Sequence, residues 1–187
     1  MSIFGTSLLE DVEVLIGGTP YSGWESVSIT KNLESFSGGF SVGVMDRWRE
    51  LVEAWAIKPG DLCIVLIGGE PVISGWVDGI ETSFDKESRT ITVKGRDKAA
   101  DLVDCSVVTK ESQFKDKTLT DIANALCGPF GISVTAETDV GKPFEKWDIT
   151  QGETVFENLD KAAKLRGVLL MSDELGNLKI TRAGVLR

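Results

Sequence analysis

The stretch that decides the fold reads IGGTPYSGW at residues 16–24, and it returns as IGGEPVISGW at residues 67–76 with one residue inserted. Each copy follows an apolar run, at residues 12–16 and 62–67. The paired glycines tolerate the positive φ that a tight hairpin turn requires, and the proline that follows cannot donate within a central ladder. Each copy therefore predicts a β-hairpin. Two copies are too few for a solenoid, so a closed or nearly closed sheet is the better interpretation.

Alternation with a period of two predicts further strands around the two hairpins. Apolar residues alternate with small or polar residues at 40–44 and at 90–94. The run LCIVLI at 62–67 is apolar at every position, so both of its faces are expected to be covered. The glycine-rich stretch at 38–43 matches no phosphate-binding motif and predicts a twisted or bulged strand.

A short helix is predicted at residues 46–58, between two of these strands. Asp46 is available as its N-cap and Pro59-Gly60 as its stop. Its apolar stripe, spaced i, i+3, i+4 and i+7, consists of Trp48, Leu51, Val52 and Trp55. A stripe with two tryptophans suits burial against another subunit, so these four residues form the predicted subunit interface. A helix that plugs its own barrel is the open alternative.

Near residue 97 the period of the apolar residues changes from two to 3.6, which predicts a helical region. A polar connector is expected at 109–117. The helix that follows has a buried stripe and ends at Gly128-Pro129. The stripe consists of Leu119, Ile122, Ala123 and Leu126.

A second helix is predicted at residues 151–166. Thr150 and Glu153 have the spacing of a capping box, and Gly167 stands where a C-cap glycine belongs. A closing hairpin is expected from strands at 168–171 and 178–181.

The predicted fold class is α+β, mainly β. We expect a β-barrel domain at residues 1–105 and a smaller α+β domain, with two helices and the closing hairpin, at residues 106–187.

The amino-acid composition is typical of an ordinary soluble protein with an excess of acidic residues. The chain has 187 residues, of which 26% are charged, and a formal net charge of −9. This charge repels a phosphate backbone, which disfavours nucleic-acid binding. The N-terminus lacks the basic flank and apolar run of a secretory signal, and no apolar run reaches membrane-spanning length. We therefore expect folding in a cytoplasm and no membrane insertion.

The sequence offers little for catalysis or metal binding. It contains no histidine, the commonest general base and metal ligand, and its three cysteines form no Cys-x-x-Cys pair. We predict no catalytic residue, no cofactor and no metal, and we interpret the cysteines as reduced core thiols. The stretch KGRD at 94–97 is interpreted as a strand end, where Arg96 and Asp97 fix a corner by charge-assisted hydrogen bonds.

Two alternatives to a structural role stay open. The first is a carbohydrate-binding or cell-wall-binding module, with Trp24, Trp48 and Trp76 as the stacking platform. Exposed aromatic side chains in a groove would favour sugar binding, whereas buried ones would favour packing or assembly. The second is a glycosidase that uses two of the acidic residues Asp78, Glu81, Asp85, Asp97, Asp101 and Asp104.

The ordered set of motifs resembles the baseplate hub proteins of Mu-like contractile phage tails. In the first half it comprises the two Gly-Gly hairpins, KPGD at 58–61, GWVD at 75–78, and VKGRD at 93–97 followed by DLVD at 101–104. In the second half, Thr118-Leu119, FGI at 130–132 and QGET at 151–154 resemble the same proteins and the related spike proteins of type VI secretion. The resemblance covers nearly the whole chain, although each motif alone is short.

The resemblance implies a tail-tube-type β-barrel followed by an α+β domain. It further implies a homotrimer that joins the tail tube to the spike proteins, located in the virion tail baseplate and assembled in the bacterial host cytoplasm. Such hub proteins are not generally enzymes, and the resemblance carries over no catalytic residue. Members are about twice as long as this chain, so a fragment that lacks a second barrel and a shorter relative both remain open.

Overall fold

The computed structural model describes residues 12–32, 36–46, 57–84, 89–109 and 111–184. The chain divides into two compact units. The first unit contains residues 1–31 and 38–97, and the second contains residues 32–37 and 98–187. The predicted α+β, mainly β class is confirmed.

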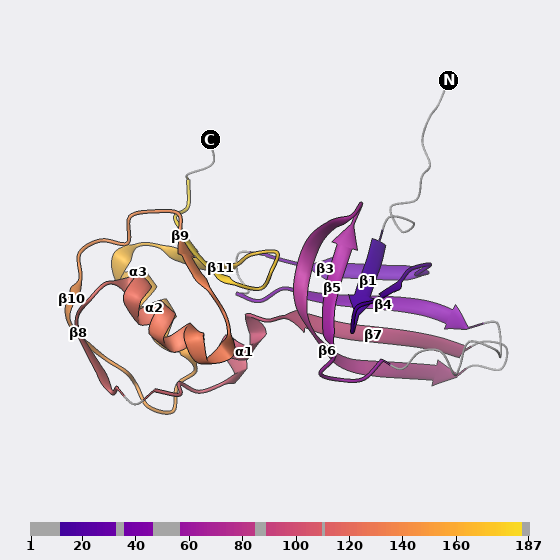
Figure 1. Cartoon of the computed structure of the whole chain (residues 1–187), viewed down its shortest axis with the longest axis horizontal. Coiled ribbons are helices and arrows are strands. Elements are labelled where there is room, and N and C mark those ends of the chain that lie inside the picture. The colour runs from indigo at the N-terminus through magenta and orange to yellow at the C-terminus, as the bar shows by residue number, and fades with distance from the viewer. Residues whose placement is uncertain (1–11, 33–35, 47–56, 85–88, 110, 185–187) are drawn as a thin grey trace, which may run out of the picture. The chain divides into compact units, whose positions relative to one another are not determined.

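The first unit is a seven-stranded antiparallel sheet in the order β2-β1-β5-β6-β7-β4-β3 (Figure 1). Its strands are β1 (Val12–Ile16), β2 (Thr19–Tyr21), β3 (Ser26–Thr30), β4 (Gly39–Asp46), β5 (Leu62–Ile67), β6 (Glu70–Phe84) and β7 (Arg89–Asp97). The glycine-rich stretch at 38–43 thus lies at the start of a strand, as predicted.

Both Gly-Gly stretches form the predicted hairpin turns. Gly17 and Gly18 have φ values of 57° and 83°, and Gly68 and Gly69 have values of 59° and 84°. Two consecutive positive φ angles are the signature of the type I′ turn, whose twist matches that of the flanking strands. The two hairpins are neighbours in the sheet, because β1 pairs with β5.

The two edge strands of the sheet do not pair with each other in the described residues, so the predicted barrel is not closed. They are nevertheless close in space, because residues 22–25 connect them and a link of that length spans at most roughly 18 Å. Trp24 lies in this link, and its side chain is buried in the core of the first unit. The sheet is therefore strongly curved, with an indole packed between its two ends.

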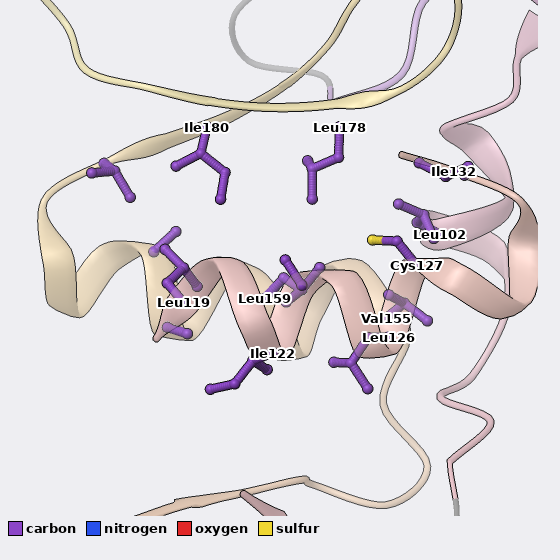
Figure 2. Packing of buried hydrophobic residues seen from close by; sticks show 14 of the residues in the cluster. Leu102, Leu119, Ile122, Leu126, Cys127, Ile132, Val155, Leu159, Leu178 and Ile180 are labelled. Atoms are coloured by element: carbon purple, nitrogen blue, oxygen red, sulfur yellow. The ribbon is translucent and has the colours of Figure 1, made fainter. Parts of the chain in front are cut away.

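The second unit packs three helices with two small sheets. The helices are α1 (Ala100–Asp104), α2 (Leu119–Cys127) and α3 (Val155–Arg166), and a 3-10 turn, η2 (Gly128–Phe130), follows α2. Its strands are β8 (Gln113–Lys117), β9 (Val134–Ala136), β10 (Phe144–Asp148), β11 (Leu169–Ser172) and β12 (Leu178–Thr181). Strand β12 lies between β11 and β9, and β8 pairs with β10. Figure 2 shows leucine and isoleucine side chains of α2, α3 and β12 meeting in one core.

The units meet in sequence at Asp97 and Lys98, earlier than the expected boundary near residue 105. The reason is that α1 packs with the second unit, where Leu102 is fully buried against α3. Residues 32–37 also belong to the second unit, and the Phe36 ring stacks on the Phe156 ring with centroids 4.6 Å apart. Both features depend on contacts between segments distant in sequence.

The predicted helix with the Leu119 stripe is confirmed as α2, and its four stripe residues are buried. Thr118 caps it with a full capping box, in which the Asp121 carboxylate accepts from the Thr118 backbone N–H at 3.0 Å. The Thr118 hydroxyl, which donates to the Asp121 carboxylate at 2.7 Å, and the Thr118 backbone N–H together lower the pKa of this carboxyl. The polar connector expected at 109–117 was in part wrong, because its last five residues form β8.

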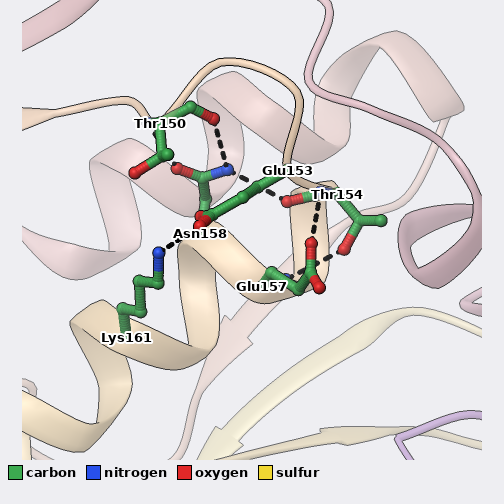
Figure 3. A network of polar contacts seen from close by, with 6 residues as sticks. All are labelled: Thr150, Glu153, Thr154, Glu157, Asn158 and Lys161. Carbon is green, nitrogen blue, oxygen red and sulfur yellow. Dashed lines mark hydrogen bonds and ion pairs between the residues drawn. The ribbon is translucent and has the colours of Figure 1, made fainter.

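The second predicted helix exists, but its start was wrong by one turn. Helix α3 begins at Val155, and the capping box joins Thr154 to Glu157 (Figure 3). Thr150 instead binds the buried Asn158 side chain through its backbone N–H and carbonyl groups, at 2.9 and 3.3 Å. Two Thr-x-x-Glu motifs follow each other directly here, at 150–153 and 154–157, and the later one caps the helix. Gly167 is the left-handed C-cap, as predicted.

The predicted helix at 46–58 falls largely on residues 47–56, which lie outside the described residues. Asp46, expected as its N-cap, is the last residue of β4. The closing hairpin is confirmed as β11 and β12, with a parallel partner, β9, that the sequence did not suggest.

Candidate functional site: the sheet edges and outer face of the first unit

The two edges of the seven-stranded sheet differ in how far they are protected from pairing with another strand. Strand β2 is three residues long and contains Pro20, which has no N–H to donate. Strand β3 is five residues long, and its sequence SVSIT contains neither proline nor a charged residue. The β3 edge is therefore the less protected of the two.

The backbone of β3 offers a row of hydrogen-bonding groups at this edge. The Glu25 N–H donates to the Gly43 carbonyl of β4 at 2.9 Å. Gly43, whose carbonyl thus faces β3, is the register partner of Ser26, and N–H and C=O groups alternate in direction along an antiparallel strand. The backbone groups at the open edge are therefore those of Val27 and Ile29, whereas the side chains on the outer face are those of Ser26, Ser28 and Thr30. These three side chains are also exposed.

The outer face of β3, β4 and β7 is polar and shallowly hollowed. Hydroxyl side chains of Ser28, Thr30 and Ser41 line the hollow together with Lys94 and Arg96. Gly39 and Gly95 also line it and contribute no side chain. Small residues on neighbouring strands leave this depression between the longer side chains at its rim.

Both cations at the rim of the hollow are ion-paired with β6. Arg96 Nε donates to Asp78 Oδ2 at 2.7 Å, and Lys94 Nζ donates to Glu81 Oε1 at 2.6 Å. Asp78 is the extra residue of a β-bulge, since Val77 pairs with Gly95 and Gly79 with Lys94. The side chains of both pairs are two-fifths exposed or more, so each pair adds at most about 1 kcal/mol to stability.

The outer face of β1, β5 and β6 carries several apolar side chains beside Glu13 and Ser74. Its residues alternate with core residues such as Val14 and Val65, and they pair as Leu15 with Ile64 and Leu62 with Trp76. Leu62 is 45% exposed and the other three are half-buried. Strand β5 lies inside the sheet, as expected, but the expectation that both of its faces are covered is wrong for the outer face, where Leu62 is exposed.

The structure separates the three tryptophans of the predicted sugar platform. Trp24 is only 4% exposed and belongs to the core, whereas Trp76 lies half-buried on the outer face. Trp24 lies in the link between β2 and β3, whereas Trp76 is a residue of strand β6. Trp48 lies outside the described residues, as do Leu51, Val52 and Trp55, so the predicted interface stripe stays a prediction.

The acidic residues named for the glycosidase alternative make structural contacts or lie in different parts of the chain. Asp78 and Glu81 are in surface ion pairs, and the buried Asp97 accepts from the Gly38 N–H at 2.7 Å. Asp101 and Asp104 belong to the second unit, and Asp85 lies outside the described residues. The prediction that Arg96 and Asp97 fix a corner by charge-assisted hydrogen bonds is confirmed.

The cysteines were predicted correctly at two positions of three. Cys63 and Cys127 are buried free thiols, and burial raises the pKa of each to about 12. Cys105 is free but exposed, which corrects the core assignment for this residue. The described part of the chain contains no cluster of three or more potential metal ligands and no helix able to span a membrane.

Comparison with protein families matches both units in order. Residues 11–97 match the N-terminal domain of Mu phage baseplate assembly protein GpP-like, and residues 99–182 match the second domain of baseplate hub protein gp44-like. The junction between the two matches coincides with the division of the structure at residues 97 and 98.

Among curated proteins, the baseplate hub protein gp44 of Escherichia phage Mu is 37% identical over 169 residues. The alignment covers 89% of this chain and 44% of gp44. The chain therefore spans less than half the length of this relative.

Among solved structures, the 43 kDa tail protein of prophage MuSo2 from Shewanella oneidensis is 47% identical, with a TM-score of 0.85. The match covers 92% of this chain and 55% of that protein. A tail protein from Neisseria meningitidis is 26% identical, with a TM-score of 0.77, over 91% of this chain and 49% of that one. A component of the E. coli type VI secretion system shares the fold alone, with a TM-score of 0.52 at 12% identity over 94% of this chain and 46% of that one. In its two consecutive domains, the chain is similar to the gp44-like baseplate hub proteins of phage tails.

Proposed function

We propose that the chain is a structural subunit of the baseplate hub of a contractile phage tail or prophage, where it joins the tail tube to the spike and acts by assembly. The observation that carries the proposal is the ordered match of both units to baseplate assembly and hub domains. The curved sheet with one unprotected edge supports it, because strand edges and apolar sheet faces are the surfaces through which such subunits associate.

The proposed partners follow from this role. They are further copies of the chain in a homotrimer, the tail tube proteins and the spike proteins. The proposed location is the virion tail baseplate, after assembly in the cytoplasm of the bacterial host. The proposed domains are a hub barrel and an α+β domain. We propose no enzymatic activity and no sequence-specific binding of nucleic acid.

Solution mass tests the assembly proposal. Light scattering coupled to gel filtration, over a range of protein and salt concentrations, is expected to show a trimer whose electron micrographs contain rings with a central opening. The same measurement on a chain as long as its relatives separates two interpretations of this sequence: a fragment that lacks a second barrel, and a shorter relative. If that longer chain also stays monomeric at every concentration, the hub assignment is wrong.

A separate experiment tests whether the predicted stripe of Trp48, Leu51, Val52 and Trp55 forms a subunit interface. Replacement of Trp48 and Trp55 by lysine is expected to abolish the oligomer while the chain remains folded, because two buried aromatic anchors would be lost. Loss of folding instead of loss of assembly would favour the alternative, in which the stripe packs against its own barrel. The matched control replaces two exposed residues of the second unit, Val108 and Leu175, by lysine.

A carbohydrate-binding module is the second candidate, and the half-buried Trp76 on an apolar outer face is the observation that favours it. Binding to peptidoglycan fragments that Trp76→Ala abolishes would support it. Absence of binding, together with a lack of hydrolysis, would leave assembly as the function.

A further inference from the structure

One segment from the first half of the chain belongs to the second unit. The chain leaves the first unit after strand β3, contributes Asn32–Ser37 to the second unit, and returns to the first unit at Gly38. Within this segment, the Phe36 side chain is 8% exposed and belongs to the core cluster of the second unit. Its ring stacks on the ring of Phe156 in α3, with centroids 4.6 Å apart. The core of the second unit is therefore completed by a residue from outside the main part of that unit.

The first unit holds both ends of this segment at one end of its sheet. Thr30, the last residue of β3, pairs with Gly39 of β4, and Gly39 pairs with Arg96 of β7. The Gly38 N–H donates to the buried Asp97 carboxylate at 2.7 Å, and the Asp97 N–H donates to the Gly38 carbonyl at 3.1 Å. The point where the chain returns from the second unit is thus hydrogen-bonded to the point where it finally enters that unit.

This pairing shortens the loop that the second unit must close in order to bury Phe36. When the first unit is folded, the path from Phe36 to the main part of the second unit runs through the Gly38–Asp97 pair and is about five residues long. When the first unit is unfolded, the path is the whole intervening chain of about sixty residues. The entropic cost of closing a loop grows with the logarithm of its length, so this difference changes the folding equilibrium of the second unit on the order of fortyfold.

We propose that the folded first unit presents Phe36 to the second unit, so that the second unit reaches its full stability only when the first unit is folded. The arrangement suits synthesis from the N-terminus, because the first unit and Phe36 are made before the main part of the second unit. Coupling of this kind is reciprocal, so the folded second unit stabilises the first unit by the same factor. The coupling is a property of the folded chain and does not rest on the proposed hub role.

Hydrogen exchange of the backbone amides measures the stability of each unit separately in the full chain. Trp24→Ala removes an indole from the core of the first unit. Urea is added to a concentration at which the amides of β5, β6 and β7 lose their protection in this variant but keep it in the wild-type chain. Under these conditions the amides of α2 and α3 are expected to exchange on the order of fortyfold faster in Trp24→Ala than in the wild-type chain.

The same comparison in a Phe36→Ala background tests whether Phe36 carries the coupling. Without the Phe36 ring, unfolding of the first unit should no longer change the exchange of α2 and α3. Ile180→Ala is the matched control, because Ile180 is a fully buried residue of the same core cluster and lies outside the segment Asn32–Ser37. This control also destabilises the second unit, but the roughly fortyfold dependence on the first unit should persist.

The first unit supplies an independent readout, which holds even where Phe36→Ala leaves the second unit without protection. Because the coupling is reciprocal, the slowest amides of β5, β6 and β7 should exchange on the order of fortyfold faster in Phe36→Ala than in the wild-type chain. Equal exchange of α2 and α3 in Trp24→Ala and the wild-type chain would mean that the units fold independently. A dependence that survives Phe36→Ala would mean that other contacts couple them. Either result, or unchanged exchange of the first unit in Phe36→Ala, overturns the proposal.

Discussion

Gly75 of β6 lies so close to β7 that a β-carbon added to it would stand 1.9 Å from the carbonyl oxygen of Arg96. The obstructing atoms are backbone, so neither strand can yield without breaking the pairing that holds the middle of the sheet. This contact explains why the second hairpin copy carries glycine immediately before its tryptophan.

Gly75→Ala is therefore expected to destabilise the first unit by about 3 kcal/mol or to prevent its folding. The matched control is Gly79→Ala in the same strand, where an added β-carbon meets nothing within 4 Å. Urea unfolding followed by fluorescence checks both variants. Equal stabilities for the two variants would contradict the close approach.

Thr154→Ala should lower the stability of the second unit by about 1 kcal/mol, because it removes the side chain that caps α3. Thr150→Ala should have little effect, since Thr150 contacts Asn158 through its backbone alone among the described hydrogen bonds. Thermal unfolding of both variants compares the two consecutive capping motifs. A larger loss at Thr150 would place the start of α3 one turn earlier.

Trp24→Ala should destabilise the first unit by about 3–5 kcal/mol, as expected when a buried aromatic side chain is truncated. Trp76→Ala should cost much less, because Trp76 lies half-buried on the outer face. Denaturant midpoints measured for the two variants separate core packing from a surface role. Comparable losses would mean that the outer face is as well packed as the core.

Cys105 should react with iodoacetamide at pH 8 long before Cys63 and Cys127, whose thiol pKa values of about 12 leave almost no thiolate at that pH. Burial favours the neutral thiols in the folded state, so their stability contribution is complete below pH 9 and is lost as the pH rises from about 9 towards 12. Peptide mass spectrometry before and after denaturation counts the modified sites. Early modification of Cys63 in the folded protein would show that the first core opens readily.

The sequence by itself determined the local elements whose signals lie within a few residues. The Gly-Gly turns, the α2 stripe and the C-cap at Gly167 were all predicted, because turn geometry and helical periodicity depend on neighbouring side chains. The order of short motifs also sufficed to indicate the hub family, although no single motif carries the resemblance.

Only the tertiary structure decided the features that depend on contacts between distant segments. The start of α3 depends on Asn158, and the start of the second unit depends on the burial of Leu102. The different surroundings of Trp24 and Trp76 depend on where the strands end, because Trp24 lies in a link and Trp76 in β6. Strand pairing and burial are properties of the folded chain, so local sequence patterns do not reveal them even though the sequence specifies them.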